Sequence, residues 1–163
     1  MIRKAGRGDV PFLRDMVRHA YYWRWGAPET ADVPAARYVE GWGRPGDRGL
    51  IALDEGFPVG AAWYRLFTAA SPGYGFLDEE TPELTIAVVP SRRGRGFGEQ
   101  LLSALLEQGS ADGFPSLSLS VEKDNPALHL YQRFGFEPVK EMDSTLVMRA
   151  QLSAGNGGSP AAG

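Results

Sequence analysis

The sequence predicts an α/β domain of the α+β kind, in which about four helices flank a mixed, mostly antiparallel central sheet of about six to seven strands. A hairpin signal, Glu55-Gly56, separates two apolar runs in the first half of the chain. In the second half a strand, a glycine-rich loop, a helix and another strand follow one another between residues 83 and 121. Two further alternating segments close the domain, so antiparallel pairs surround one parallel crossover unit.

The first half begins with a short strand at Ile2–Ala5, followed by a helix. Asp9 is the expected N-cap of this helix, because an aspartate side chain accepts hydrogen bonds from the first turn. The helix is indicated by apolar residues at helical spacing, namely Phe12, Leu13, Met16, Val17 and Ala20. A second, short helix is expected over Ala35–Trp42, and the hairpin strands over Leu50–Asp54 and Phe57–Phe67.

The central part of the chain predicts a crossover between two parallel strands. Alternating apolar residues indicate a strand over Glu83–Val89, which Pro90 ends, and a parallel neighbour over Ser116–Val121. A helix that ends at Gly113 connects them in a right-handed sense. Its apolar face is formed by Phe97, Leu101, Leu102, Leu105 and Leu106.

The last part predicts one helix and two strands. Asn125 is the expected N-cap of the helix, with Pro126 at its first position and Gly135 just past its end. Strands over Phe136–Glu141 and Ser144–Ala150 complete the sheet. The domain therefore spans residues 1–152, and residues 153–163, SAGNGGSPAAG, are expected to form a flexible tail because they carry no large apolar side chain.

Composition limits the classes of function. The chain has 163 residues, no cysteine and two histidines, His19 and His129, so no disulfide scaffold, catalytic thiol or metal site is expected. A net charge of −3 disfavours a nucleic-acid partner. No apolar run approaches the length of about 20 residues that a membrane span needs, and no apolar run follows the first charges, so a cytoplasmic location without a membrane partner is expected.

The stretch from Val88 to Gly98, VVPSRRGRGFG, lies between a predicted strand and a predicted helix. A helix start presents unpaired N–H groups, glycines allow an anion to approach the backbone, and arginines add permanent charge, so the stretch predicts a phosphate site. A P-loop is excluded because no Lys-Ser or Lys-Thr follows. A dinucleotide site, with Glu122 as the ribose ligand, is disfavoured by the G-x-G-x-G spacing, and a plain surface turn remains an alternative.

Two motifs identify a family resemblance. Arg93, Gly96 and Gly98 fit the pattern R-x-x-G-x-G directly after the strand that ends in AVVP. About 25 residues further on, residues 125–136 read NPALHLYQRFGF and fit N-x-A-x-x-L-Y-x-x-x-G-F. In this order and at this separation the motifs resemble those of the GNAT superfamily of N-acetyltransferases. The order of elements from Ile2 to about Ala150 also fits that fold, in which the fourth and fifth strands splay apart.

The resemblance implies that acetyl-CoA binds as co-substrate between the splayed strands, with no metal. Backbone amides of the loop would hold the pyrophosphate, and the end of the fourth strand would pair with the pantetheine arm. Asn125 would contact this arm, or serve only as an N-cap. The residues so implied are Val88, Val89, Arg93, Gly94, Arg95, Gly96, Phe97, Gly98 and Asn125.

The resemblance also implies two catalytic residues. Tyr131 matches the residue that protonates the departing thiolate, although a tyrosine on an apolar helix face is also an ordinary core residue. Glu83 opens the fourth strand and is the first choice for the base that deprotonates the acceptor amine. The acids of the preceding loop are the alternatives, namely Asp78, Glu79 and Glu80. His19 is expected to cap the first helix, and His129 to lie on the surface.

The implied reaction is transfer of an acetyl group to a primary amine of a small molecule, by direct attack in a ternary complex. A protein N-terminus or lysine is an alternative acceptor, and a non-catalytic acyl-CoA-binding module is the alternative class. A homodimer is left open. Aromatic residues near the two early helices would line the acceptor pocket or pack in the core, namely Tyr21, Tyr22, Trp23, Trp25 and Trp42. Trp63 and Tyr64 alternate on a strand, so at most one of them can face the cleft.

Overall fold

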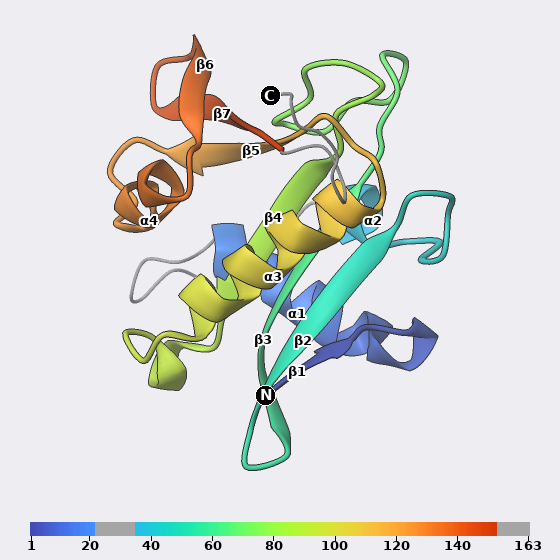
Figure 1. The fold of residues 1–163 in the computed structure, drawn as a ribbon, viewed down its shortest axis with the longest axis vertical. Helices are drawn as coiled ribbons and strands as arrows, with labels where there is room; N and C mark the ends of the chain where they lie inside the picture. Colours follow the sequence, from blue (N-terminus) through green and yellow to red (C-terminus); the bar gives the residue numbers. More distant parts are fainter. Residues whose placement is uncertain (22–34, 153–163) are drawn as a thin grey trace.

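One mixed sheet organises the computed structural model, which describes residues 1–21 and 35–152 (Figure 1). Its seven strands run in the order β1-β2-β3-β4-β5-β7-β6 across the described residues. The strands are β1 Ile2–Lys4, β2 Arg48–Asp54, β3 Phe57–Arg65, β4 Glu83–Val88, β5 Ser116–Glu122, β6 Glu137–Glu141 and β7 Thr145–Gln151. The helices are α1 Val10–Tyr21, α2 Ala35–Tyr38, α3 Phe97–Ala111 and α4 Ala127–Arg133, with short 3₁₀ turns at Arg7–Asp9 and Pro90–Arg92. The predicted fold class is confirmed.

The turn signals of the sequence are confirmed as well. Glu55 and Gly56 both have positive φ, 52° and 87°, which is the geometry of a tight hairpin turn between β2 and β3. Gly135 follows α4 with φ 92°, and the N–H of Phe136 reaches back to the carbonyl of Tyr131. Gly113 plays the same part after α3, with φ 88°.

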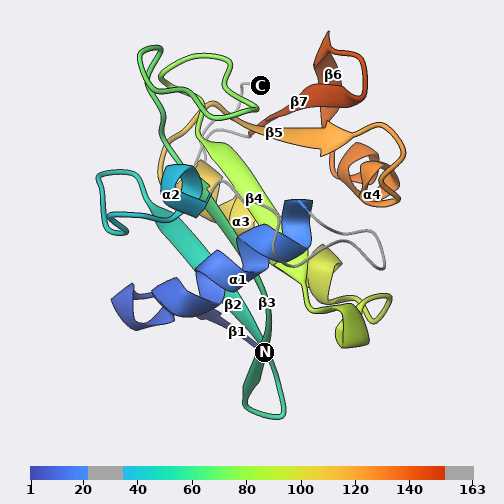
Figure 2. The same ribbon diagram turned by 180° about the vertical axis from the view of Figure 1, so that it is seen from behind.

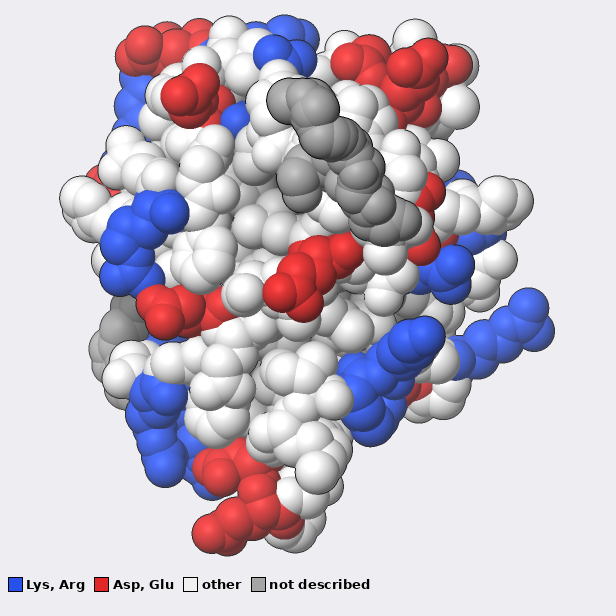
Figure 3. Space-filling view, viewed as in Figure 1, with Lys and Arg blue, Asp and Glu red and all other residues white. Residues whose placement is uncertain are grey.

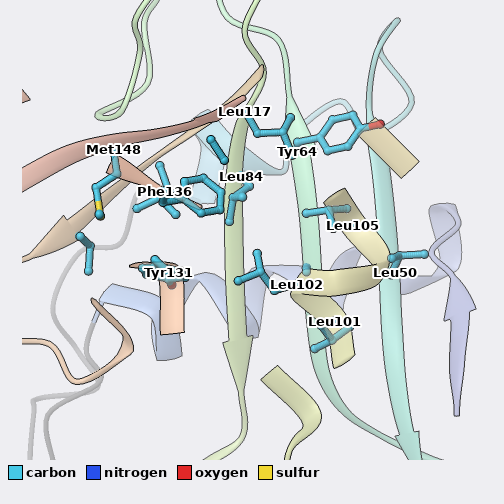
Figure 4. Close-up of a cluster of buried hydrophobic side chains, with 14 of the residues drawn as sticks. Leu50, Tyr64, Leu84, Leu101, Leu102, Leu105, Leu117, Tyr131, Phe136 and Met148 are labelled. Atoms are coloured by element: carbon cyan, nitrogen blue, oxygen red, sulfur yellow. The ribbon is translucent and has the colours of Figure 1, made fainter. Parts of the chain in front are cut away.

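Helices cover both faces of the sheet. On one face α1 and α2 pack against β2, β3 and β4, and on the other α3 packs against the same strands (Figures 1 and 2). Figure 4 shows the core on the α3 side of the sheet, where Leu102 and Leu105 of α3 lie near Leu84 of β4. Because both faces are covered, Trp63 packs on the α1 side and Tyr64 on the α3 side, and neither lines the cleft described below.

Three predicted helix starts or ends are shifted, each for a local reason. Asp9 lies in the 3₁₀ turn before α1 instead of capping α1, and its carboxylate accepts hydrogen bonds from the Gly6 N–H and the Arg3 guanidinium. The helix α2 ends at Tyr38, where the Arg65 guanidinium donates hydrogen bonds to the carbonyls of Val39 and Glu40. The helix α4 begins at Ala127, and Asn125 Oδ1 accepts the Ala127 N–H at 2.9 Å from one residue before the N-cap.

The parallel strands β4 and β5 form the opening on which the site depends. They pair at Glu83 and Ser118, where the Ser118 N–H donates to the Pro82 carbonyl at 2.9 Å, and then diverge (Figure 1). All other neighbours in the sheet are antiparallel. The expected splay of the fourth and fifth strands is therefore present. The predicted tail, residues 153–163, lies outside the described residues.

Candidate active site

A cavity of about 1060 Å³ fills the gap between β4 and β5. Its walls come from both strands, the loop before α3, the start and middle of α4, the end of α1 and the turn between β6 and β7. This volume is at the upper end of the range of small-molecule sites in proteins. The cavity therefore accommodates an elongated ligand together with a second, smaller one.

The loop before α3 forms one end of the cavity. Gly94 and Gly96 have φ values of 77° and 89°, which L side chains rarely adopt, and Gly96 is the N-cap of α3. The first N–H groups of a helix lack intrahelical acceptors, so those of Phe97 and Gly98 are directed out of the helix end. Gly98 also lines the cavity. Backbone donors and the positive end of the α3 dipole thus meet at one point.

The loop arginines have different partners. Arg92 Nε lies 2.8 Å from Asp54 Oδ2 in the hairpin, and Arg95 reaches the same carboxylate at 4.0 Å. Arg93 Nε donates to the Val88 carbonyl at 3.2 Å, and partial burial lowers the Arg93 pKa. Arg92 and Arg93 line the cavity. Asp54 therefore ties the loop to the sheet, a contact that the loop sequence alone does not reveal.

The edge of β4 presents every second peptide group to the gap. The Val89 N–H donates to the Val59 carbonyl at 2.8 Å, on the β3 side, and the Val89 carbonyl accepts the Arg92 N–H at 3.0 Å. Hydrogen-bond direction alternates along a strand, so the peptide groups of Leu84, Ile86 and Val88 face β5 and the cavity. A ligand in the gap can therefore pair with β4 as an additional strand would.

The helix α4 forms the opposite wall. Asn125 and Tyr131 both line the cavity. The Tyr131 side chain is 8 % exposed and packs edge-on against Phe136, with 5.9 Å between ring centroids (Figure 4). Burial raises the pKa of Tyr131 above its ordinary value, so the phenol remains protonated at physiological pH.

A buried carboxylate lies where β4 and β5 meet. Glu83 lines the cavity, is 2 % exposed and accepts a hydrogen bond from the Tyr38 hydroxyl at Oε2, at 2.5 Å. Its other oxygen, Oε1, is buried without a hydrogen-bond partner among the described residues. Burial raises the pKa of Glu83 to about 7, against the opposing effects of the Tyr38 hydroxyl, the Gly75 amide and the charge of Arg37.

Comparison with known proteins identifies the family. Residues 10–136 match the family model described as the acetyltransferase (GNAT) family. The chain belongs to the GNAT acetyltransferase family. Its fold is similar to that of yncA, a putative acetyltransferase from Salmonella typhimurium solved with its cofactor acetyl-CoA, with a TM-score of 0.71, 22% identity and 98% of each chain covered.

Two curated relatives differ in how far they match the GNAT domain. The L-methionine sulfoximine/L-methionine sulfone acetyltransferase of Pseudomonas aeruginosa is 40% identical over 142 residues, which cover 83% of this chain and 79% of the relative. The mycothiol acetyltransferase of Brachybacterium faecium is 34% identical over 113 residues, covering 69% of this chain and 32% of the relative. The chain therefore spans about a third of the mycothiol acetyltransferases that it matches.

The structure brings most of the predicted GNAT site residues together. Eight of them line one cavity, namely Glu83, Val88, Arg93, Gly94, Phe97, Gly98, Asn125 and Tyr131. Arg95 and Gly96 belong to the loop but do not line the cavity, and the Arg95 side chain is directed toward Asp54. Val89 does not line the cavity either. Its N–H and carbonyl groups are both hydrogen-bonded within the protein.

The loop acids and the histidines are distributed differently from the expectation. Glu79 accepts the Ala69 N–H and Asp78 accepts the Glu80 N–H, all on an exposed loop outside the cavity. His129 is exposed, as predicted. His19 is a residue that the sequence analysis missed, since it lines the cavity from the last turn of α1.

Of the aromatic residues assigned to the acceptor pocket, Trp42 packs in the α1-side core, and its ring lies 5.9 Å from the Arg65 guanidinium. The side chain of Tyr21, and Tyr22, Trp23 and Trp25, lie outside the described part of the structure. Two tyrosines that the sequence analysis did not single out lie at the site. Tyr74 lines the cavity and Tyr38 holds Glu83, although their sequence context, a polar loop and a one-turn helix, carries no signal for either role.

Metal-ligand clusters and membrane spans were sought among the described residues of the GNAT domain. None of these residues gather as three or more potential metal-binding His, Asp or Glu side chains. Over the same ranges, no helix is both long and apolar enough to cross a membrane. Basic and acidic side chains alternate over the face shown in Figure 3.

Proposed function

We propose that the protein is an N-acetyltransferase that moves an acetyl group from acetyl-CoA to the primary amine of a small molecule, by direct attack in a ternary complex. One observation carries this proposal. A buried carboxylate with an unpartnered oxygen and a buried phenol line the same cavity, whose far end is a helix N-terminus with glycines and arginines. An acid, a base and an anion site thus share one cleft.

The residues present suit acetyl-CoA. The diphosphate fits the N–H groups at the start of α3, with Arg92 and Arg93 as counter-charges. The amide groups of the pantetheine arm fit the outward peptide groups of Leu84, Ile86 and Val88. When bound, the co-substrate supplies a thioester carbonyl as the acetyl donor. A gap-facing amide of β4, such as that of Val88, would polarise that carbonyl.

Glu83 is the proposed base. An alkylammonium has a pKa of about 10.4, so the acceptor must lose a proton before its nitrogen can attack. Glu83, which lines the cavity, takes that proton and becomes a neutral acid. Its raised pKa, about 7, makes it a stronger base than an exposed glutamate. It remains ionised only above that pH, which predicts an acid limb near neutrality.

Tyr131 is the proposed acid. As the new C–N bond forms and the C–S bond breaks, the sulfur leaves with the electron pair and takes the phenolic proton of Tyr131, and the second proton lost by the acceptor nitrogen replaces it on the phenolate. Burial disfavours both the phenolate and the thiolate, so the sulfur leaving into this apolar wall is a better proton acceptor than in water. Holding both reactants in one cavity supplies a further part of the rate.

A small-molecule acceptor is favoured by the relative from Pseudomonas aeruginosa, which matches over most of both chains and is named for a methionine derivative. The test is an acceptor screen with acetyl-CoA and a panel of free amino acids, methionine sulfone, polyamines, and peptides that begin with alanine or contain lysine. Thiol release with a mass increase of the small amine supports the proposal. Acetylation of the peptides alone would assign a protein acceptor. Binding of acetyl-CoA without transfer would leave an acyl-CoA-binding module, and no binding would overturn the whole assignment.

Replacing Tyr131 with phenylalanine tests the acid. We expect kcat to fall about 10²-fold, because a positioned acid contributes that order of rate, with little change in the Kd for acetyl-CoA. Tyr64→Phe is the matched control, since it removes a buried tyrosine hydroxyl on β3 that does not line the cavity. An unchanged kcat for Tyr131→Phe would contradict the role and leave Tyr131 as a core residue.

A further inference from the structure

The carboxylate of Glu83 is held from outside the cavity. Tyr38, which is fully buried and does not line the cavity, donates its hydroxyl proton to Glu83 Oε2. The same hydroxyl accepts the Tyr74 N–H at 2.9 Å. This arrangement fixes the direction of the hydroxyl, since its acceptor side is occupied by the amide and its proton is directed to the carboxylate. Glu83 Oε1 is the buried oxygen without a hydrogen-bond partner among the described residues, and it lies against the Gly73 backbone.

Side chains of β3 hold the segment that carries Tyr38. Its described part, the helix α2 at Ala35–Tyr38, ends at Tyr38, and the last carbonyls of a helix have no intrahelical donors. The Arg65 guanidinium donates hydrogen bonds to carbonyl groups at the end of α2: to that of Glu40 at 2.9 Å, of Arg37 at 3.3 Å and of Val39 at 3.4 Å. On the other side of Tyr38, the Trp63 indole donates to the Tyr38 carbonyl at 3.1 Å. Side chains of β3 therefore replace the helical hydrogen bonds that α2 lacks.

Arg65 is in turn fixed by Asp47. The two side chains form a paired contact, Nε to Oδ1 at 3.0 Å and Nη2 to Oδ2 at 2.9 Å, and each is 1 % exposed. A buried ion pair of this kind is weak evidence for stability, because desolvation offsets the attraction between the charges. Geometric specificity is the better attested use of such a pair. Arg65 also lies directly opposite Glu83 in the register of β3 and β4.

We propose that Asp47, Arg65 and Tyr38 form a positioning relay, in which the buried ion pair fixes α2 so that the Tyr38 hydroxyl holds the Glu83 carboxylate in the wall of the cavity. None of the three touches the reactants, so they are positioning residues. The proposal rests on the proposed function only in taking Glu83 as the base.

The relay predicts a shift in the titration of Glu83. The Tyr38 hydroxyl stabilises the charged carboxylate, so its removal raises the Glu83 pKa further. The other groups that face Glu83 or its cavity stay in place in such a variant. They are Arg37 on α2, Tyr74 and the Gly75 amide in the loop before β4, the Asp47–Arg65 pair next to β3, Arg92 and Arg93 in the loop before α3, Glu122 at the end of β5, His19 on α1 and Tyr131 on α4.

The experiment compares Tyr38→Phe with the wild type in two ways. The first is the pH profile of kcat/KM with the best acceptor of the screen, whose acid limb we expect to move up by about one pH unit or more. The second measurement does not require activity. It is a ¹³C NMR titration of protein labelled at the glutamate side-chain carboxyl carbon, and the Glu83 signal is assigned by its loss in Glu83→Gln. The Glu83 signal in Tyr38→Phe should titrate higher by the same amount. Tyr64→Phe is the control and should move neither reading.

Two variants test the Asp47–Arg65 pair. Asp47→Asn removes the carboxylate, and Arg65→Lys keeps the positive charge but loses the planar guanidinium, so that the test does not depend on the folding of one variant. Each should raise the Glu83 titration in the wild-type background and leave it unchanged in the Tyr38→Phe background, because all act through one hydroxyl. An unmoved Glu83 signal in Tyr38→Phe would overturn the relay. Equal shifts in both backgrounds would limit it to Tyr38. If no acceptor is found, the proposed function fails, and the NMR titration still decides the relay.

Discussion

Two buried tyrosine–carboxylate pairs lie on opposite faces of the sheet and have opposite properties. On the α1 face Tyr38 donates to Glu83, and on the α3 face Tyr64 donates to Asp112. Asp112 also accepts hydrogen bonds from Arg48 and Gln108, so both of its oxygens have partners, and these contacts lower its pKa. Glu83 has one partnered oxygen and deeper burial, and its pKa is raised.

The two carboxylates differ in how many of their oxygens are hydrogen-bonded and in how deeply they are buried. Asp112 is the C-cap of α3, where saturated contacts hold the helix end against β2 and β3. Glu83 has a hydrogen bond to one oxygen only, and it lines the cavity. Desolvation without full compensation is the condition under which an acid becomes basic near neutral pH. The protein contains both outcomes of the same tyrosine–carboxylate contact.

The largest expected effect separates the two carboxylates by activity. Glu83→Gln should lower kcat/KM at pH 8 by about 10²–10⁴-fold and flatten the acid limb of the pH profile, because the base is removed while the size of the side chain is kept. Asp112→Asn is the matched control and should retain the specific activity of the wild type, although it loses about 1–3 kcal/mol of stability. Steady-state kinetics and urea unfolding on both variants make the comparison. Equal losses of activity would remove the distinction drawn here.

A second prediction separates them by the pH dependence of stability. The Glu83 pKa is raised from 4.5 to about 7 on folding, so the folded state binds a proton that the unfolded state does not, and stability falls as the pH rises through this window. The free energy of unfolding should therefore drop by up to about 3 kcal/mol between pH 4.5 and 8 relative to Glu83→Gln. Asp112 acts in the opposite sense, since its lowered pKa gives stability that is lost as the pH falls below about 4.

Urea unfolding at a series of pH values checks this prediction. The wild type and Glu83→Gln should converge near pH 4.5 and separate toward pH 8, whereas Asp112→Asn should differ from the wild type least at the acid end. Parallel curves for the wild type and Glu83→Gln would show that the carboxylate titrates equally in the folded and unfolded states.

The smallest expected effect concerns the glycines behind Glu83, which have no counterpart at Asp112. A Cβ added at Gly73 would lie 2.1 Å from Glu83 Oε1, so Gly73→Ala must displace the carboxylate. We expect kcat/KM to fall about 10-fold, the effect of a misplaced base, with little loss of stability. Gly8→Ala is the control, because a Cβ there meets nothing within 4 Å. Unchanged kinetics in Gly73→Ala would mean that the position of Oε1 does not matter.

The order of the elements and the shape of the loop before α3 could be predicted from the sequence alone. Gly94, Gly96 and the start of α3 lie within a few residues of one another, and Gly135 ends α4 by the same local rule. Local backbone geometry depends on neighbouring residue types, so it can be predicted from a short stretch of chain. Glu83 and Tyr131 could be named because each stands at a fixed place in an element or motif.

The burial and the hydrogen bonding of Glu83 could not be predicted from the sequence, because they depend on residues that are distant in the chain. Tyr38 lies 45 positions away in the chain, and the Asp47–Arg65 pair, the Gly73 backbone and the cavity-lining His19 come from four other segments. The covered second face of β3, which withdraws Trp63 and Tyr64 from the cleft, is equally a property of packing. The physical reason is that burial, and with it the basicity of a carboxylate, depends on which distant side chains exclude water from it.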